Sequence, residues 1–507
     1  MRIKHLLVLV VSLIAFYNLK ANNLQISNMY LRGQNDAEGY KMIKMDVRWD
    51  NSWRTSTYES NYDAVWIFAK YRLLWQEGVW YHATINVTGS SVPAGASVDV
   101  PSDGKGAFIY RNADGSGSVN FADLQLRWNY AVDGLNNTDS VEICVYGIEM
   151  VYVPQGSFYV GDGSGSSSGQ FIRGTTTNTP FQVTSEGAIT INNTINSELW
   201  GTSTSGANQI GASGSLPDAY PKGYNAFYVM KYAIAQGQYR DFLNKLTRTQ
   251  QSNRALGITG TGNFYNNNTS PVNRNGIRLA SDLGSTYPRV YDCDLNNNGV
   301  GNELDDGEHI ECNWLSYYDL QAYCDWSGLR PMTELEFEKA CRGTLSPFPD
   351  EKAWGNTNIS VATGIMNSGL GSEAPTNPTT TNVAFGNSSG VQGPLRVGCF
   401  AGATTTREQA GATYYGIMEM SGNCWEWVVD VARAASRSYT GLHGDGVLST
   451  AGDYNQTNWP NRGGLRGGAW SSTASNLLNV SDRTSVVGDY YNQRYNTAAG
   501  RCVRTAQ

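Results

Sequence analysis

Short apolar segments recur along the first 150 residues, separated by turn-forming runs. Residues 45–49, 64–68, 119–128 and 141–146 alternate apolar and polar side chains, or stay apolar, over the length of a strand. Runs such as Pro-Ala-Gly and Asn-Ala-Asp-Gly-Ser lie between them and favour turns. This pattern predicts an all-β, sandwich-like unit over residues 22–147.

The pattern changes beyond residue 149. Residues 227–243 read as a strand followed by a helix, in which Ala235, Tyr239 and Phe242 fall at helical spacing and would face a core. An extended segment over 150–161 precedes them. The sequence therefore predicts that a second unit, which contains helices as well as strands, begins near residue 149.

Two further helices have clear N-terminal signals. Ser316 stands three residues before Asp319, and Thr333 stands three residues before Glu336. Both pairs fit the capping box, in which the two side chains satisfy backbone N–H groups at the helix start. Gly328 suits the left-handed position that ends the first of these helices.

Three glutamates lie two residues apart in the second of these helices, at Glu334, Glu336 and Glu338. A spacing of two does not place neighbours on one helical face. We therefore interpret them as capping and solvent-exposed residues rather than as an acid–base pair.

Length and charge narrow the class of protein. A chain of 507 residues is too long for one ordinary core, so two or more domains are expected. Only 16% of residues are charged, and 56 are glycine, which suits a loop-rich or β-rich extracellular protein. The net charge is −7 and no basic cluster occurs, so the sequence predicts neither a nucleic-acid partner nor docking on an anionic membrane.

The first 21 residues have the features of a secretory signal peptide. Arg2 and Lys4 precede an apolar stretch over 6–17, which is too short to span a membrane as a stable helix. No later segment is apolar enough to cross a membrane. We expect a secreted, cell-surface or periplasmic protein, whose eight cysteines are structural rather than redox-active.

One loop has the ligand spacing of an EF-hand-type calcium site. Oxygen ligands would come from side chains at loop positions 1, 3, 5, 9 and 12 and from the backbone at position 7, with Gly299 at the sharp turn. These ligands are Asp294, Asn296, Asn298, Val300, Asn302 and Asp305. The alternative is an acidic, Asn-rich surface turn. Cys293 and Cys312 flank the loop, and a disulfide between them would stabilise it by roughly 3 kcal/mol.

Three runs carry a resemblance to a known family. Residues 466–470 read Arg-Gly-Gly-Ala-Trp, residues 329–343 read Leu-Arg-Pro-Met-Thr-Glu-Leu-Glu-Phe-Glu-Lys-Ala-Cys-Arg-Gly, and residues 150–161 begin Met-Val-Tyr-Val-Pro-Gln-Gly. In this order they resemble the formylglycine-generating enzyme, or sulfatase-modifying factor, family. The resemblance covers 149–507 and implies an α+β fold of the C-type-lectin-like kind, rich in irregular backbone and fixed by disulfides and calcium.

The resemblance also implies particular ligands and one disulfide. The family's second calcium site falls on Glu419, Gly422, Cys424 and Glu426. The alternative is a core pair of tryptophans beside a solvated glutamate. The family's link between its central helix and its last strand falls on Cys324 and Cys502.

The chain departs from the family at the active site. The two copper-binding cysteines of the enzyme correspond to Ser472 and Leu477, and neither side chain suits copper(I), which prefers sulfur. The iron-dependent relatives need a histidine cluster, whereas His82, His309 and His443 are scattered. We therefore expect no bound copper and no catalysis by either route.

A pocket near the C-terminus is the remaining candidate. Trp470, Ser472, Asn476 and Arg483 would line it, and such residue types are common on binding surfaces. The alternative is a polar surface loop. The first hypothesis is an exported, calcium-stabilised, non-catalytic binding or structural component of the cell surface, with an unknown surface ligand or protein partner. The second is an oxidase that converts a cysteine of a sulfatase-type substrate to formylglycine, using another pair such as Cys399 and Cys424.

Overall fold

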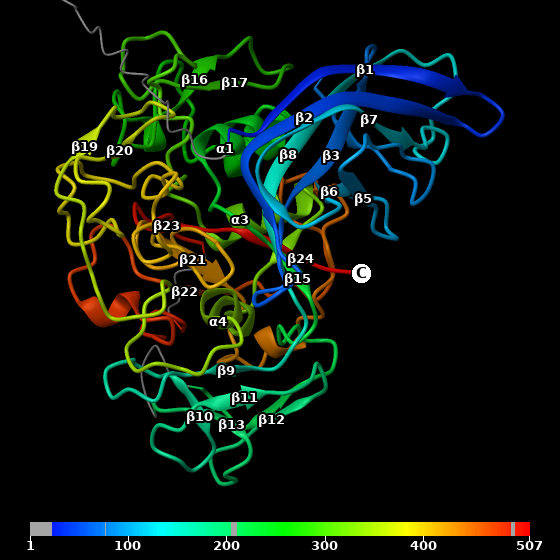
Figure 1. Cartoon of the computed structure of the whole chain (residues 1–507). Helices are drawn as coiled ribbons and strands as arrows, with labels where there is room; N and C mark the ends of the chain where they lie inside the picture. The colour runs from blue at the N-terminus through cyan, green and yellow to red at the C-terminus, as the bar shows by residue number, and fades with distance from the viewer. Residues whose placement is uncertain (1–22, 77, 204–209, 488–491) are drawn as a thin grey trace, which may run out of the picture.

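The computed structural model describes residues 23–76, 78–203, 210–487 and 492–507 (Figure 1). Within these residues the chain is mostly short strands and irregular backbone, with four α-helices. The expected α+β class is therefore confirmed at this coarse level. The predicted signal segment, residues 1–21, lies outside the described residues.

The N-terminal unit contains a three-stranded antiparallel sheet. Its order is β1 (Gln25–Asn35), β2 (Tyr40–Arg54) and β7 (Gly115–Trp128). Its inner face packs on strands of a second sheet, through a core that includes Trp49, Phe121 and Val65. Apolar alternation along β2 and β7 produces this arrangement, because every second side chain points to the same face.

The second sheet is long and joins the two predicted units. Its order is β18-β24-β15-β8-β3-β6-β5, with β4 beside β3. The strands are β3 (Asp63–Leu73), β4 (Tyr81–His82), β5 (Ala96–Asp99), β6 (Ala107–Arg111), β8 (Val141–Val153), β15 (Phe227–Met230), β18 (Arg330–Pro331) and β24 (Cys502–Thr505). The expected boundary between residues 147 and 149 falls inside β8, so one continuous strand belongs to both units (Figure 1).

Four helices lie beside the long sheet and the small sheets. They are α1 (Gln236–Leu243), α2 (Arg248–Arg254), α3 (Tyr317–Trp326) and α4 (Glu334–Arg342). The capping boxes Ser316–Asp319 and Thr333–Glu336 both form. Helix α2 begins with a third capping box, Thr247–Gln250, which the sequence analysis did not identify.

Small sheets and single helical turns make up the remaining regular structure of the described residues. The strands are β9 (Phe158–Val160), β10 (Phe171–Arg173), β11 (Phe181–Val183), β12 (Ile189–Ile191), β13 (Leu199–Gly201), β14 (Gly214–Leu216), β16 (Ile277–Ser281), β17 (Val290–Cys293), β19 (Ile365–Met366), β20 (Ala374–Pro375), β21 (Trp425–Val428), β22 (Gly464–Arg466) and β23 (Ala498–Ala499). The 3₁₀ turns are Tyr265–Asn267, Ser436–Ser438 and Ser475–Leu478. Strand β21 pairs with both β22 and β23 and places the 425–428 and 464–466 motifs side by side.

The cysteines are mostly thiols. Cys324 on α3 and Cys502 on β24 form a disulfide with a Cα–Cα distance of 5.7 Å, which ties the central helix to the long sheet. Cys293 and Cys312 do not form the expected second disulfide, since both are free and buried in the main core. Buried free cysteine behaves as a small apolar side chain, so the pair contributes packing instead of a covalent link.

Candidate functional site

The four residues expected to line a C-terminal pocket do not share an opening. Trp470 is only 3% exposed, packs in an apolar cluster with Cys399 and Phe400, and donates from Nε1 to the Asn496 carbonyl at 3.0 Å. Arg483 is fully buried and forms an ion pair with Glu334. Both side chains therefore serve the interior of the fold and are not positioned to meet a ligand.

The other two expected pocket residues lie nearer the surface. The Ser472 hydroxyl accepts from the Ala469 N–H at 3.0 Å, and its carbonyl accepts from the Gly386 N–H at 2.9 Å. Asn476 donates to Asp482 at 3.1 Å. Ser472 and Asn476 are half-buried and stabilise the turns after Trp470.

Helix α4 carries a buried ion-pair network that the sequence analysis missed. Its three glutamates are at most 1% exposed, so the expectation of solvation is wrong for them. The ion pairs are Glu334–Arg466, Glu334–Arg483, Glu336–Arg330, Glu338–Arg466 and Glu338–Arg342. Because helix α4 is buried all round, charges on every face need partners inside the protein.

The paired arginines set the charge state of this network. Burial alone would raise the pKa of Glu334, but Arg483 and Arg466 hold the pKa of its carboxyl below the usual value. Glu334 also accepts from the Val431 N–H at 2.6 Å. The network is thus a neutralised structural centre, and the Arg466 and Arg483 side chains of the motif region are part of it.

The cysteine pair proposed for an alternative oxidase is buried. Cys399 and Cys424 are 3% and 1% exposed. Burial raises the pKa of both thiols well above the usual value, with Glu419 adding to the shift for Cys399 and Glu311 for Cys424. Copper(I) binds thiolates, and without a metal burial keeps both groups as thiols away from solvent.

Some of the residues expected at the second calcium site already have hydrogen-bond partners within the protein. Glu426 is 1% exposed and receives two hydrogen bonds from Arg501, at 2.8 and 2.6 Å. Glu419 accepts from the Gly398 N–H at 2.7 Å through Oε1, whereas its buried Oε2 has no partner among the described residues. Gly422 donates to the Gly467 carbonyl, which holds this turn beside β22.

A further carboxylate lies near that site. Burial raises the pKa of Glu311 well above its usual value, and Glu426 and Glu419 raise it further. Its Oε2 atom has no partner within the described residues. These two buried carboxylate oxygens are costly to leave unsatisfied, although the ligand atoms of Glu311, Glu419 and Glu426 do not all lie within 4.8 Å of one another.

The loop over 294–306 gathers oxygen atoms, but not in the expected set. Asn296 donates to Asp305 at 3.1 Å and Asn298 donates to Glu303 at 2.5 Å, so these side chains converge. Gly299 has φ +88°, in keeping with the sharp turn. Asn302 faces elsewhere, since its Oδ1 accepts from Arg240 at 2.7 Å.

Two other loop ligands have defined surroundings. The Asp294 carboxylate is fully buried, pairs with Arg278, and accepts the N–H of Gly299 at 3.1 Å. Val300 donates its N–H to Asn298 at 2.7 Å, and its side chain is exposed. Asp294 therefore anchors the loop to β16 and already has a cationic partner.

Glu303, Asp305 and Asp306 form the loop's acidic cluster. Their ligand atoms lie within 4.8 Å of one another, and they are the only such group of three or more His, Cys, Asp or Glu side chains in the described residues. Asp306 is fully buried with an unpartnered Oδ1, and burial, followed by the charges of neighbouring carboxylates, raises its pKa. The residues present therefore fit a calcium ion, with Glu303 and Asp306 in place of Asn302.

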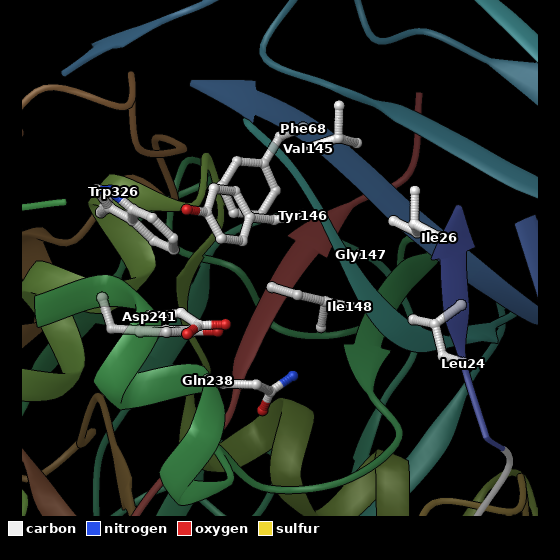
Figure 2. Close-up of a pocket in the computed structure, with 11 residues that line it drawn as sticks. Leu24, Ile26, Phe68, Val145, Tyr146, Gly147, Ile148, Gln238, Asp241 and Trp326 are labelled. Carbon is white, nitrogen blue, oxygen red and sulfur yellow. The ribbon is translucent and has the colours of Figure 1, made fainter. Parts of the chain in front are cut away.

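A small pocket of about 200 Å³ lies between the N-terminal strands and helices α1 and α3 (Figure 2). Leu24 and Ile26 form one side, and Gln238 and Asp241 of α1 form the other. Burial raises the pKa of Tyr146, so its phenol stays protonated. The pocket offers hydrogen-bonding groups but no activated nucleophile.

A fold with small sheets around a buried helix, and with the motif at 466–470 in its interior, defines a protein of the sulfatase-modifying-factor class. The family profile described as "Sulfatase-modifying factor enzyme 1-like domain" matches residues 142–506. This match covers more than half of the chain, so the chain belongs to that family, as the motifs indicated.

Relatives of this chain include both oxygenases and an inactive member. The chain is 29% identical to "Hercynine oxygenase" of Mycolicibacterium smegmatis over 33% of this chain and 32% of the relative. It is 29% identical to "Inactive C-alpha-formylglycine-generating enzyme 2" of Bos taurus over 27% and 38%. It is 31% identical to "Formylglycine-generating enzyme" of Bos taurus over 23% and 26%. The chain thus spans about two fifths or less of each relative's length.

Among the helices of the described residues, none is both long enough and apolar enough to cross a membrane.

Proposed function

We propose that this protein is an exported, calcium-stabilised and non-catalytic member of its family, acting as a binding or structural component of the cell surface. The observation that carries the proposal is chemical: Ser472 and Leu477 stand where the family resemblance places the two copper-binding cysteines. A hydroxyl is a poor ligand for copper(I), and an aliphatic side chain is none.

The interior of the fold supports the same proposal. Trp470, Arg466 and Arg483 are used for packing and ion pairing instead of lining a reaction cleft. The remaining candidate thiols, Cys399 and Cys424, are buried and protonated. Export is proposed from the apolar pattern over residues 1–21.

We propose calcium at two sites, in each of which a buried carboxylate oxygen lacks a hydrogen-bond partner among the described residues. The first is the loop cluster of Glu303, Asp305 and Asp306. The second lies around Glu419, Glu426 and Glu311. When bound, the ion would supply positive charge that these carboxylates lack and would fix irregular backbone.

The test is a direct assay for oxidation. The purified full chain is incubated with copper, oxygen and a peptide containing Cys-x-Pro-x-Arg, and the peptide mass is read. We expect no conversion of cysteine to formylglycine, while an active formylglycine-generating enzyme run in parallel converts the same peptide.

Conversion by the full chain would overturn the non-catalytic proposal and favour the oxidase. In that case Cys399→Ser and Cys424→Ser would identify the thiols responsible, with Cys144→Ser as the control. Cys144 is a suitable control because it is a free cysteine in the N-terminal part of β8, outside the 425–470 motif region.

A further inference from the structure

A large cavity lies where the N-terminal unit meets the family domain. It has a volume of about 720 Å³ and is open to solvent. One wall comes from the end of β2 and the loop after it, including Trp53 and Glu59. The other comes from residues 401–418, and Lys231 and Tyr232 complete the lining. The volume falls within the range of small-molecule sites, about 300–1,000 Å³.

The two walls are tied together, so the cleft is already formed. Asn61 donates to the Tyr415 carbonyl at 2.8 Å, and Trp53 donates from Nε1 to Asn61 at 3.3 Å. Gly416, with φ +86°, lets the chain run close to the Trp53 ring, because an added Cβ would lie 3.2 Å from it. A preformed site avoids much of the entropy lost when a ligand orders its surroundings.

Lys231 lies in this cleft with its hydrogen-bonding capacity unused. Its side chain is 2% exposed, and its Nζ lies 4.5 Å from the Trp53 ring centroid and 5.7 Å from that of Tyr232. Burial lowers its pKa, while the charges of Asp63 and Glu149 act in the opposite direction. Within the described residues no hydrogen bond or ion pair is formed by this ammonium group, although a buried donor normally has one.

A second donor in the cleft also lacks an acceptor. Tyr415 is 2% exposed, and its hydroxyl has no partner among the residues described. Burial raises the pKa of this phenol, so it stays a donor at neutral pH. A buried hydroxyl and an ammonium group that lines the cleft, both without an acceptor among the described residues, point to a ligand that brings oxygen atoms.

The charge and polarity of the other residues that line the cleft indicate which class of ligand it could bind. Asp50 and Glu59 balance the positive charges of Lys231 and Arg407, so the cleft as a whole does not favour a charged ligand. Hydroxyl and amide side chains cover much of the wall, and half-buried aromatic rings interrupt them. These residues are Asn51, Thr55, Ser118, Thr405, Thr406 and Thr413, and the rings are Trp53, Tyr232 and Tyr414.

We propose that this cleft binds a short neutral saccharide. Sugar rings combine an apolar C–H face, which packs against aromatic rings, with hydroxyl oxygens that accept hydrogen bonds. The apolar face would lie against Trp53 or Tyr232, and ring hydroxyls would accept from Lys231 Nζ and the Tyr415 hydroxyl. The inference deepens the binding role given under the proposed function and rests on it.

The experiment titrates the full chain with four neutral disaccharides, maltose, cellobiose, lactose and N,N′-diacetylchitobiose, and with glucuronic acid, by isothermal calorimetry. We expect at least one neutral disaccharide to bind and glucuronic acid not to bind. Tyr415→Phe should weaken that binding at least tenfold, because it removes one donor and leaves the ring in place. Lys231→Met and Trp53→Ala should weaken it further.

The matched control is Lys245→Met. Lys245 also lies over a tryptophan ring, with its Nζ 3.9 Å from the Trp80 centroid, but it does not line the cleft. Its replacement should leave binding unchanged. Circular dichroism checks that each variant folds, and Tyr415→Phe keeps the test valid if Lys231→Met does not fold.

Three results would overturn the inference. They are no binding of any of the four disaccharides by the folded protein, binding of glucuronic acid alone, and binding that Tyr415→Phe and Lys231→Met leave unchanged. None of these results alters the outcome of the formylglycine assay, so the failure of one proposal is distinguishable from the failure of the other.

Discussion

Helix α4 and the loop over 294–306 both concentrate acidic side chains, but they balance that charge in opposite ways. The three glutamates of α4 are buried and each forms an ion pair with at least one arginine. The loop's Glu303, Asp305 and Asp306 lie within 4.8 Å of one another, and no ion pair involves them in the described part of the chain. The first region carries its own counter-charge, whereas the second has no cationic side chain paired with it among the described residues.

The pKa values express the same difference. Arginine neighbours hold the pKa of Glu334 below its usual value in spite of burial, whereas burial and neighbouring carboxylates raise the pKa of Asp306. Acidity along a chain is therefore a poor guide to metal binding until the positions of the arginines are known.

Breaking the α4 network should have the largest effect. Glu334→Gln leaves Arg483 and Arg466 with less negative charge in a fully buried site, and such a loss costs about 3–5 kcal/mol of unfolding free energy. Urea unfolding measures it. The control is Glu38→Gln, whose exposed pair with Arg127 should contribute less than about 1 kcal/mol. Equal losses for both variants would mean that the network does not stabilise the fold.

The loop should respond to calcium instead. Calcium at a hundredfold excess over its Kd should stabilise the chain by about 2.7 kcal/mol relative to chelator, seen as a rise in Tm. Asp305→Asn and Asp306→Asn should reduce that rise, whereas Asp123→Asn, at an exposed pair with Arg32, should not. A Tm that is indifferent to both chelator and added calcium would refute both proposed calcium sites.

Asp325 is a buried carboxylate with no arginine partner among the described residues, so it extends the comparison to the pH dependence of stability. Burial raises the pKa of Asp325 on α3 to about 7, although it accepts the N–H groups of Asp445 and Asn455. The folded state then binds this proton more tightly than the unfolded state. The contribution of Asp325 to the free energy of unfolding is therefore greatest below about pH 4 and falls as pH rises toward 7.

The slope from this one group is at most about 1.4 kcal/mol per pH unit. Asp325→Asn cannot ionise, so its unfolding free energy should change less between pH 5 and pH 7 than that of the parent chain. Guanidinium unfolding at several pH values tests this, and parallel pH profiles for the two proteins would contradict it.

Local sequence signals predicted local structure well. The strands within β2, β3 and β7 followed from apolar alternation, and the starts of α3 and α4 followed from capping boxes whose partners are three residues apart. These signals are readable because both interacting groups lie in one short segment.

Long-range features were not predictable in the same way. Glu334 was expected in solvent because its arginine partners, Arg466 and Arg483, lie more than 120 residues away in sequence. Glu336 and Glu338 have partners nearby in sequence, Arg330 and Arg342, but the burial of the whole helix was not readable from that spacing. The same separation explains why Arg483 was expected at a pocket, whereas Trp470 was misplaced because its packing against Cys399 and Phe400 has no local signal. The cleft around Lys231 combines segments from four parts of the chain, and no motif marks it.

Strand β8 has a consequence for how this protein can be divided. β3 pairs with it in register from Asp63 opposite Val151 to Leu73 opposite Val141, so residues on both sides of the expected boundary hold the same partner. A cut or a graft at residue 148 would separate Asp63, Ala64 and Val65 of β3 from their backbone partners Val151, Met150 and Glu149 in β8. The N-terminal unit is therefore not an exchangeable module. Recombination or truncation that preserves both halves must keep β8 whole.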